Sequence, residues 1–318
     1  MSTPQATKNN THEIESVTNT DSLDANTQEV EAHSDEIIHE STIFAEPIGK
    51  IGGLTVTNAL FTSWIAVGII VLLAISLKRS LSKTPKGIQS VFEFLINGAL
   101  GLCDQVTNDR ALSKKVFPIV ISLFFFILIN NWLGIIPGVG SIGQVVNHDG
   151  HKVFIPYIRG GTADINTTLA LSIFAVLASN VFGALIIGTW KTFNKYINIK
   201  AIASIPSKVL KDPAVLVVAP ITFFVGVVEI VGEVAKIASL SFRLFGNVFA
   251  GEVLLASMAA LMSFGVPIPF MFLEILVGFI QALIFSMLTL VYFTIASQDH
   301  DEHEEHEEKH GNLEVVHE

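Results

Sequence analysis

Six charged or amide side chains lie within one strongly apolar stretch of the sequence, residues 229–252. They are Glu229, Glu233, Lys236, Arg243, Asn247 and Glu252. A charge at membrane depth costs about 2.5–3.5 kcal/mol on insertion scales, and such residues generally mark ion or substrate pathways. Arg243 is the extreme case, because a guanidinium group does not give up its proton inside a protein. We therefore expect this stretch to carry the chemistry of the protein, with Arg243 at its centre.

The spacing of these residues distributes them around a helix, at about 100° per residue. Lys236 and Asn247 lie about 20° and 40° from Arg243 on the helical wheel, and Glu229 also lies about 40° away. Glu252 falls about 180° away, on the opposite side. At about 1.5 Å per residue, Glu229 and Glu252 lie about 21 Å and 13 Å from Arg243, in opposite directions along the axis. Two acidic regions with a permanent cation between them predict two ion paths that do not meet.

The composition of the chain is typical of a polytopic membrane protein. Of its 318 residues, 50% are hydrophobic and only 15% are charged, whereas soluble domains are about 25% charged. The formal net charge of −10 arises mostly from the two tails. A single cysteine, Cys103, excludes an intramolecular disulfide and provides no metal framework. The N-terminal region lacks the basic and apolar segments of a cleavable signal peptide, so we expect none.

We predict an all-α membrane domain, residues 46–298, with five transmembrane helices and one amphipathic interfacial helix. Apolar runs long enough to cross the roughly 30 Å hydrocarbon core occur at residues 51–77, 116–136, 165–190, 213–263 and 269–297. Pro118 would lie in the first turn of the second span, where proline is tolerated. Residues 88–108 alternate apolar and polar side chains at helical spacing, as in helices that lie at a membrane surface. We expect a disordered acidic tail at residues 1–45 and an acidic, His-rich tail at residues 299–318.

Basic residues in the short loops predict the orientation of the chain. Segments 78–115 and 191–211 hold seven and five Lys or Arg residues, whereas loops 137–164 and 264–268 hold two and none. The basic segments should face the cytoplasm, which places the N-terminus outside and the C-terminus inside. As helices, the last two spans would be about 75 Å and 42 Å long. We therefore expect them to form a strongly tilted hairpin whose side lies against another protein.

Four signatures in the sequence resemble the a subunit of rotary F-type ATP synthases. They are Ser241-Phe-Arg-Leu-Phe-Gly-Asn247 with Ala250-Gly-Glu252, Asn130-Asn-Trp-Leu-Gly-Ile-Ile-Pro137, Thr162-Ala-Asp-Ile-Asn-Thr-Thr-Leu169, and Glu274 followed by Gln281. The resemblance runs in order over residues 45–298 and leaves out both tails. It implies a non-catalytic proton-channel subunit in a bacterial cytoplasmic (inner) membrane. The implied partners are the c-subunit ring, the peripheral-stalk b subunits, the lipid bilayer and, indirectly, the catalytic head, with no nucleic acid.

The resemblance also implies roles for individual residues. Arg243 would face the c-ring carboxylate and separate two offset proton half-channels. The residues lining the implied paths are Asn247, Glu252, Glu274 and Gln281 in the outer half-channel, Glu229 and Glu233 at the inner exit, and Asp164 and Asn166 elsewhere on the path. A ring carboxyl group would be neutral in lipid, because desolvation disfavours its charged form, and would ionise beside Arg243. Proton entry and exit through different half-channels would then couple proton flow to ring rotation and ATP synthesis.

Two of these residues, Glu233 and Asp164, also have a simpler structural explanation. Glu233 and Lys236 have the spacing of an i,i+3 salt bridge on a helix. Asp164 stands where the N-cap of the third span is expected.

Some relatives carry a histidine where this chain has Glu274, so the proton-relay chemistry at this position would differ between them.

Two further motifs carry no function in our interpretation. Gly138-Val-Gly-Ser-Ile-Gly143 has the spacing of a dinucleotide fingerprint but follows a membrane span instead of a strand. His306-Glu-Glu-Lys-His310 matches a zinc-protease motif but lies in a tail with no fold around it. The sequence contains no Gly-x-x-x-x-Gly-Lys-[Ser/Thr] phosphate-binding loop, so we expect no nucleotide site. We also expect no cofactor and no bound metal.

Three alternative functions stay open at this point. The coupled ion could be Na⁺, because ion choice is expected to depend chiefly on the carboxyl site of the c ring. A secondary transporter would also place polar groups at mid-depth, but transporters commonly contain paired repeats, and the 229–252 stripe has no second copy. A purely structural assembly subunit would leave the charge of Arg243 unexplained.

Overall fold

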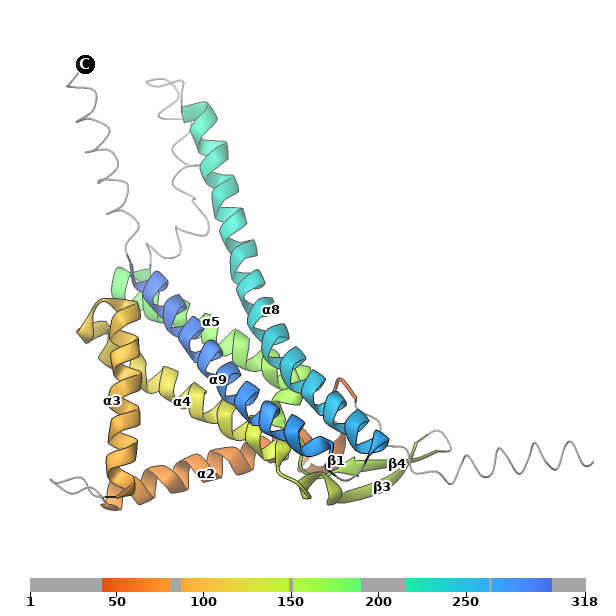
Figure 1. The fold of residues 1–318 in the computed structure, drawn as a ribbon. Helices are drawn as coiled ribbons and strands as arrows, with labels where there is room; N and C mark the ends of the chain where they lie inside the picture. The colour runs from red at the N-terminus through yellow and green to blue at the C-terminus, as the bar shows by residue number, and fades with distance from the viewer. Residues whose placement is uncertain (1–41, 81–86, 149–150, 190–214, 263–264, 299–318) are drawn as a thin grey trace, which may run out of the picture.

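The computed structural model describes residues 42–80, 87–148, 151–189, 215–262 and 265–298 (Figure 1). The helices are α2 (Asn58–Ser80), α3 (Ile88–Thr107), α4 (Arg110–Ile135), α5 (Ile165–Ile187), α8 (Val215–Leu261) and α9 (Pro267–Ser297), with 3-10 turns η1 (Val139–Ser141) and η2 (Gly161–Ala163). Within the described ranges, five helices are long and apolar enough to cross a membrane, and α3 is not among them. The predicted class of helical polytopic membrane protein is confirmed.

Two antiparallel hairpins interrupt the helical pattern. Strand β1 (Pro47–Ile51) pairs with β2 (Leu54–Thr57), and β3 (Gly143–His148) pairs with β4 (His151–Pro156). The first turn is made by Gly52 and Gly53, whose φ angles of 57° and 89° suit glycine because it has no Cβ. Both hairpins occupy segments for which sequence analysis predicted no strand.

The first hairpin corrects the predicted start of the first span. Sequence analysis began it at Ile51, but α2 begins at Asn58. Asn58 is fully buried, its backbone N–H donates to Glu46 O, and its side-chain oxygen accepts from the N–H groups of Glu46 and Ala59. The preceding Thr55-Val56-Thr57 run is β-branched and favours a strand. The predicted span included this region because it is apolar. In the structure, however, its backbone is paired in the β1–β2 hairpin.

The second span also begins at a different position from the predicted one. Helix α4 starts at Arg110 instead of residue 116, because the side chain of Asp109 accepts a hydrogen bond from the backbone N–H of Ala111 at 2.7 Å and caps the helix. Pro118 consequently lies inside the helix, and its predicted place in the first turn is wrong. The apolar run alone could not reveal the charged first turns of α4.

The other helix bounds differ from the predictions by a few residues. Helix α3 covers most of the predicted interfacial segment, and α5 begins at the predicted residue and ends at Ile187. Helices α8 and α9 correspond to the two long spans. The tail predictions for residues 1–41 and 299–318 lie outside the described residues.

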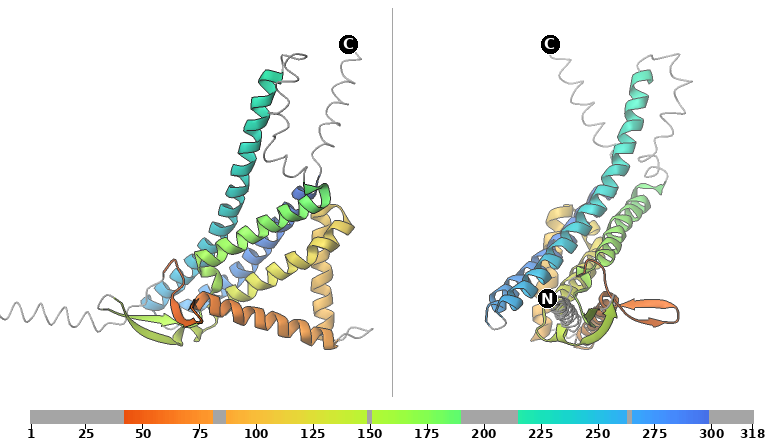
Figure 2. Two further views of the ribbon diagram at one scale, coloured as in Figure 1. Left: turned by 180° about the vertical axis from the view of Figure 1, so that it is seen from behind. Right: turned by 90° about the vertical axis from the view of Figure 1, so that its right-hand side faces the viewer.

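The helices form a bundle from which one long helix projects. Helices α4, α5 and α9 pack together, and the C-terminal part of α8 packs on α5 and α9 (Figures 1 and 2). Helix α3 connects the end of α2 to the start of α4 and packs on α4 and α9. With 47 and 31 residues, α8 and α9 are about 70 Å and 46 Å long. These lengths agree with the predicted long hairpin, whose tilt to the membrane stays a prediction.

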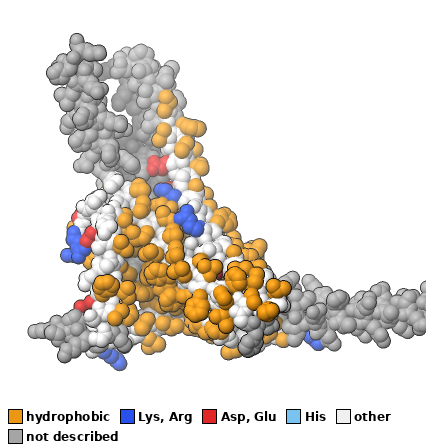
Figure 3. Space-filling model, viewed as in Figure 1, with side chains coloured by type: hydrophobic (Ala, Val, Ile, Leu, Met, Phe, Trp, Pro, Cys, Tyr) orange, Lys and Arg blue, Asp and Glu red, His pale blue; other side chains and the backbone are white. Residues whose placement is uncertain are grey.

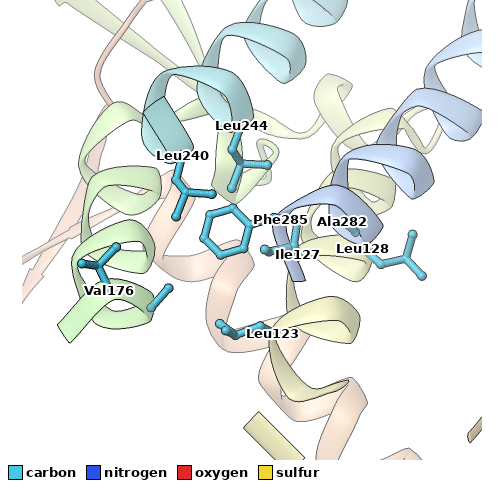
Figure 4. Close-up of a cluster of buried hydrophobic side chains, with 9 residues drawn as sticks. Leu123, Ile127, Leu128, Val176, Leu240, Leu244, Ala282 and Phe285 are labelled. Atoms are coloured by element: carbon cyan, nitrogen blue, oxygen red, sulfur yellow. The ribbon is translucent and has the colours of Figure 1, made fainter. Parts of the chain in front are cut away.

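The hydrophobic core lies where α4, α5, α8 and α9 meet (Figure 4). Its buried residues are Leu123, Ile127, Leu128, Ala175, Val176, Leu240, Leu244, Ala282 and Phe285. Leu240 and Leu244 are four residues apart and therefore share one face of α8. Their packing around Phe285 of α9 fixes the rotation of α8 about its axis. The direction of every polar side chain on α8 follows from this rotation.

Candidate functional site

Arg243 lies on the outer side of α8. Its side chain is exposed, and its Nη2 donates to Ser239 Oγ at 3.4 Å. Among the described residues, no carboxylate forms an ion pair with it. The same helix exposes Val231, Val234 and Phe242, each more than 60% accessible, and one face of the molecule is largely hydrophobic with a few charged side chains (Figure 3). Arg243 is thus a cation presented on an apolar surface.

Lys236, the other cation of the stripe, is paired within the chain. Its Nζ lies 2.8 Å from Glu233 Oε1 and 5.4 Å from the ring centroid of Tyr292 on α9. Asn180 of α5 donates its side-chain amide to Glu233 Oε2 at 3.1 Å. The i,i+3 salt bridge is therefore confirmed, and it joins α5, α8 and α9. Glu229, one turn before Glu233 on α8, is half-buried.

Glu252 forms an ion pair with a residue that sequence analysis did not select, Arg159. The guanidinium of Arg159 donates from Nε to both Glu252 oxygens, at 2.9 and 3.1 Å, and from Nη2 to Oε2 at 2.9 Å. The side chain of Arg159 is only 6% exposed, whereas that of Glu252 is 33% exposed. The signal available in the sequence was slight: an arginine in a loop, five residues before Asp164.

Glu274 lies buried on α9 against the backbone of α8. A Cβ atom added at Gly251 would stand 2.2–2.3 Å from the carboxyl atoms of Glu274, so the absence of a side chain at Gly251 makes room for this group. Gln281, two turns along α9, is also buried, and its Nε2 has no hydrogen-bond partner in the described part of the chain. Asn247 is half-buried on α8. The structure therefore places Glu274 against Gly251, the residue that precedes Glu252.

Two residues of α4 hold α9 in this position. Asn131 donates its side-chain amide to Gly278 O at 3.1 Å, and Trp132 donates its indole N–H to Ile275 O at 3.2 Å. Thr162 of η2 in turn donates its hydroxyl to Asn131 Oδ1. The signature around Asn130 thus positions the turn of α9 that carries Glu274.

Asp164 acts as the N-cap of α5. Its carboxylate accepts hydrogen bonds from the backbone N–H groups of Asn166 and Thr167, both at 3.3 Å, and from Ala45 N–H at 3.3 Å. The structural explanation weighed for Asp164 is confirmed. Its role on an ion path, like that of the exposed Asn166, stays a prediction.

The described residues contain no group of three or more His, Cys, Asp or Glu side chains arranged to hold a metal ion. The zinc-protease-like match at residues 306–310 lies outside the described residues.

Comparison with known proteins assigns the chain to a family. The family model of the ATP synthase A chain matches residues 60–294. The ATP synthase subunit a of Syntrophobacter fumaroxidans is 34% identical over 232 residues, which cover 73% of this chain and 80% of the relative. That of Mycobacterium marinum is 33% identical over 257 residues, covering 78% and 91%. ATP synthase subunit a 3 of Pelobacter propionicus is 30% identical over 235 residues, covering 74% and 85%. The chain belongs to the ATP synthase A chain family.

Proposed function

We propose that this member of the ATP synthase A chain family translocates protons as the stator subunit of a rotary ATP synthase, with Arg243 facing the carboxyl groups of a c-subunit ring. The family membership supports the stator role, and one structural observation supports the role of Arg243. Its guanidinium lies exposed on a helix that also exposes large apolar side chains, and no carboxylate among the described residues pairs with it. A permanent cation in such a place gains most from an anion supplied by another subunit. A carboxylate on a ring that moves past α8 would be such an anion.

The mechanism that we propose follows from the opposing effects of lipid and arginine on a carboxyl group. In lipid, desolvation holds a ring carboxyl group in its neutral form. Beside Arg243 the ionised form is favoured, so the proton leaves. A fixed positive charge at this point also repels a hydrated proton and would prevent direct passage between the two sides. Ring rotation would then be the only route from one half-channel to the other.

We assign the two half-channels to the two directions along α8 from Arg243. The outer half-channel would contain Asn247 and Glu252 of α8 and Glu274 and Gln281 of α9, with Glu274 lying against Gly251 of α8. The inner exit would lie at Glu229, about 21 Å from Arg243 in the other direction. Glu233 contributes less directly in this assignment, because its carboxylate is engaged by Lys236 and Asn180.

The proposed setting is a bacterial cytoplasmic membrane, with the N-terminus outside and the C-terminus in the cytoplasm. The proposed partners are the c ring, the peripheral-stalk b subunits, the bilayer and, indirectly, the catalytic head. The proton is the proposed coupled ion, with Na⁺ as the alternative. A secondary transporter is the rival from another class, and copurification separates the two, because only the rotary complex requires a c ring and a peripheral stalk.

The decisive experiment is ATP-driven proton pumping by the whole complex in liposomes, with wild type compared with Arg243→Ala. Passive proton leak is recorded in parallel while the nucleotide sites are idle. We expect lost pumping, intact assembly and a raised leak. Arg110→Ala is the matched control, because Arg110 is also exposed but pairs with Asp104 at the α3–α4 junction; it should pump as wild type does. Normal coupled pumping by Arg243→Ala would refute the proposal.

A further inference from the structure

Arg159 is a buried cation whose hydrogen-bonding capacity is fully used. Besides its bonds to Glu252, it donates from Nη2 to Thr42 O at 2.7 Å and from Nη1 to Thr42 Oγ1 and Phe44 O at 3.3 and 3.4 Å. A guanidinium has five N–H donors in a rigid fork, and here each nitrogen faces an acceptor. Only 7% of the residue is exposed. Arg159 thus connects three segments: the N-terminal stretch, the loop before η2, and α8.

The two carboxyl groups at this end of the α8–α9 hairpin have very different surroundings. Both oxygens of Glu252 are bonded by Arg159. Among the described residues, none donates a hydrogen bond to Glu274, whose carboxyl group lies against the backbone of Gly251, the residue preceding Glu252. The carboxylate of Glu252 is therefore fixed by hydrogen bonds from Arg159, whereas no hydrogen bond from the described residues fixes the carboxyl group of Glu274.

We propose that Arg159 is a positioning residue of the outer half-channel that keeps Glu252 as a stationary carboxylate, so that Glu274 is the carboxyl group that exchanges protons. The inference rests on the proposed function, since it assumes that this end of the hairpin carries protons. A carboxylate gripped at both oxygens by a guanidinium cannot turn to pass a proton on without losing its charge-assisted hydrogen bonds. Protonating it would also leave a buried cation without its counter-charge, which is strongly unfavourable.

The charged groups around Glu274 determine how its proton exchange responds to substitution. Glu252 follows Gly251, the residue that Glu274 contacts, and Arg159 pairs with Glu252. The other charged groups on the packed elements are Arg243, eight residues before Gly251 on α8, and the buried Asp164 at the start of α5. Helix α4 contributes the uncharged Asn131 and Trp132 near this turn of α9. Removing one member of the Arg159–Glu252 pair leaves an unbalanced charge beside Glu274, of opposite sign in the two cases.

The test is the initial rate of ATP-driven pumping by the intact complex in vesicles whose internal pH is varied, with the catalytic head outside. Arg159→Gln leaves a negative charge near Glu274 and should move the pH midpoint up by about one unit, whereas Glu252→Gln leaves a positive charge and should move it down by about as much. The double variant Arg159→Gln/Glu252→Gln should return towards the wild-type midpoint. Glu274→Gln should remove this dependence of the pumping rate on internal pH. If the Arg159–Glu252 ion pair only stabilised the fold, the variants would change the amount of assembled complex without shifting the pH midpoint in opposite directions.

Two further variants keep the test interpretable. Arg159→Lys keeps the charge without the planar fork, so we expect the wild-type midpoint with a rate lowered about tenfold, as imprecise placement costs rate. Arg110→Gln removes an arginine from an exposed ion pair elsewhere and should change neither quantity. If Arg159→Gln does not assemble, the downward shift of the midpoint in Glu252→Gln and its reversal in the double variant carry the comparison, because the double variant contains no unpaired buried charge.

Two results would overturn the inference. One is an unchanged or equally shifted midpoint in the Arg159 and Glu252 variants, and the other is a wild-type pH profile in Glu274→Gln. If either occurs while Arg243→Ala still abolishes pumping, the inference fails and the proposed function stands. Normal pumping by Arg243→Ala would instead refute the proposed function itself.

Discussion

Replacing Gly251 with alanine would place a methyl group on the carboxyl group of Glu274. The new Cβ atom would lie 2.2 Å from Cδ and Oε1 of Glu274. Ordinary van der Waals contact begins at 3.4 Å, so the carboxyl group would have to retreat by about 1 Å or more. The obstructed atoms are the end of a flexible side chain, which can move without displacing a helix. We therefore expect the substitution to change proton transfer far more than stability.

The expected magnitude follows from this displacement. A misplacement of about 1 Å in a reacting group can cost about 100-fold in rate, so Gly251→Ala should lower the rate of ATP-driven proton pumping by about 10- to 100-fold. Its stability should change little, because alanine adds about 0.5–1 kcal/mol of helix propensity relative to glycine, which offsets part of the rearrangement. Pumping rate per assembled complex and the thermal unfolding midpoint are the two measurements.

Gly246→Ala is the matched control on the same helix. A Cβ atom at Gly246 would meet no atom of the described residues within 4 Å, while the gain in helix propensity is the same. We expect pumping within about twofold of wild type, provided that the added methyl group does not meet a partner subunit; Gly232, which is equally open, serves as a second control. If Gly251→Ala pumps as well as these variants, the placement of Glu274 against Gly251 is irrelevant to transport and our reasoning is refuted.

Three other predictions concern packing, capping and thiol reactivity. Gly183→Ala would put a Cβ atom 2.2 Å from the backbone oxygen of Ala296; since backbone cannot retreat easily, thermal unfolding should show a loss of about 1–3 kcal/mol, and no loss would contradict the close approach of α5 and α9. Asp164→Ala removes the N-cap of α5 and should cost about 1 kcal/mol in the same assay, with Asp164→Asn retaining most of the stability; equal stability of the two variants would argue against capping. Burial, and then the charge of Asp104, raises the pKa of the Cys103 thiol on α3, so a soluble maleimide should label it at least tenfold more slowly before than after denaturation. Because the thiolate is the reactive form, labelling should accelerate as the pH rises, and rapid labelling of the native protein at neutral pH would exclude a buried thiol.

Local features of the fold could be predicted because they depend on residues close together in the sequence. The length of an apolar run predicts a membrane helix, and the spacing of Glu233 and Lys236 predicts their salt bridge. Asp164 before an apolar run predicts an N-cap. Errors arose where hydropathy was the sole guide: it extended the first span through a β-hairpin to Ile51, and it missed the charged first turns of α4 that begin at Arg110.

The sequence by itself determined that one helix carries a polar stripe with Arg243 at its centre, since helical periodicity places those residues whatever surrounds them. Only the tertiary structure decided which way the stripe faces, because the rotation of α8 is set by the packing of Leu240 and Leu244 in the core. It also decided the partners of the outer carboxyl groups. Arg159 and Glu252 are 93 residues apart in the chain, and Glu274 meets Gly251 across a helix interface. No local pattern encodes such pairs, because they exist only when helices far apart in the sequence pack at one particular rotation and depth.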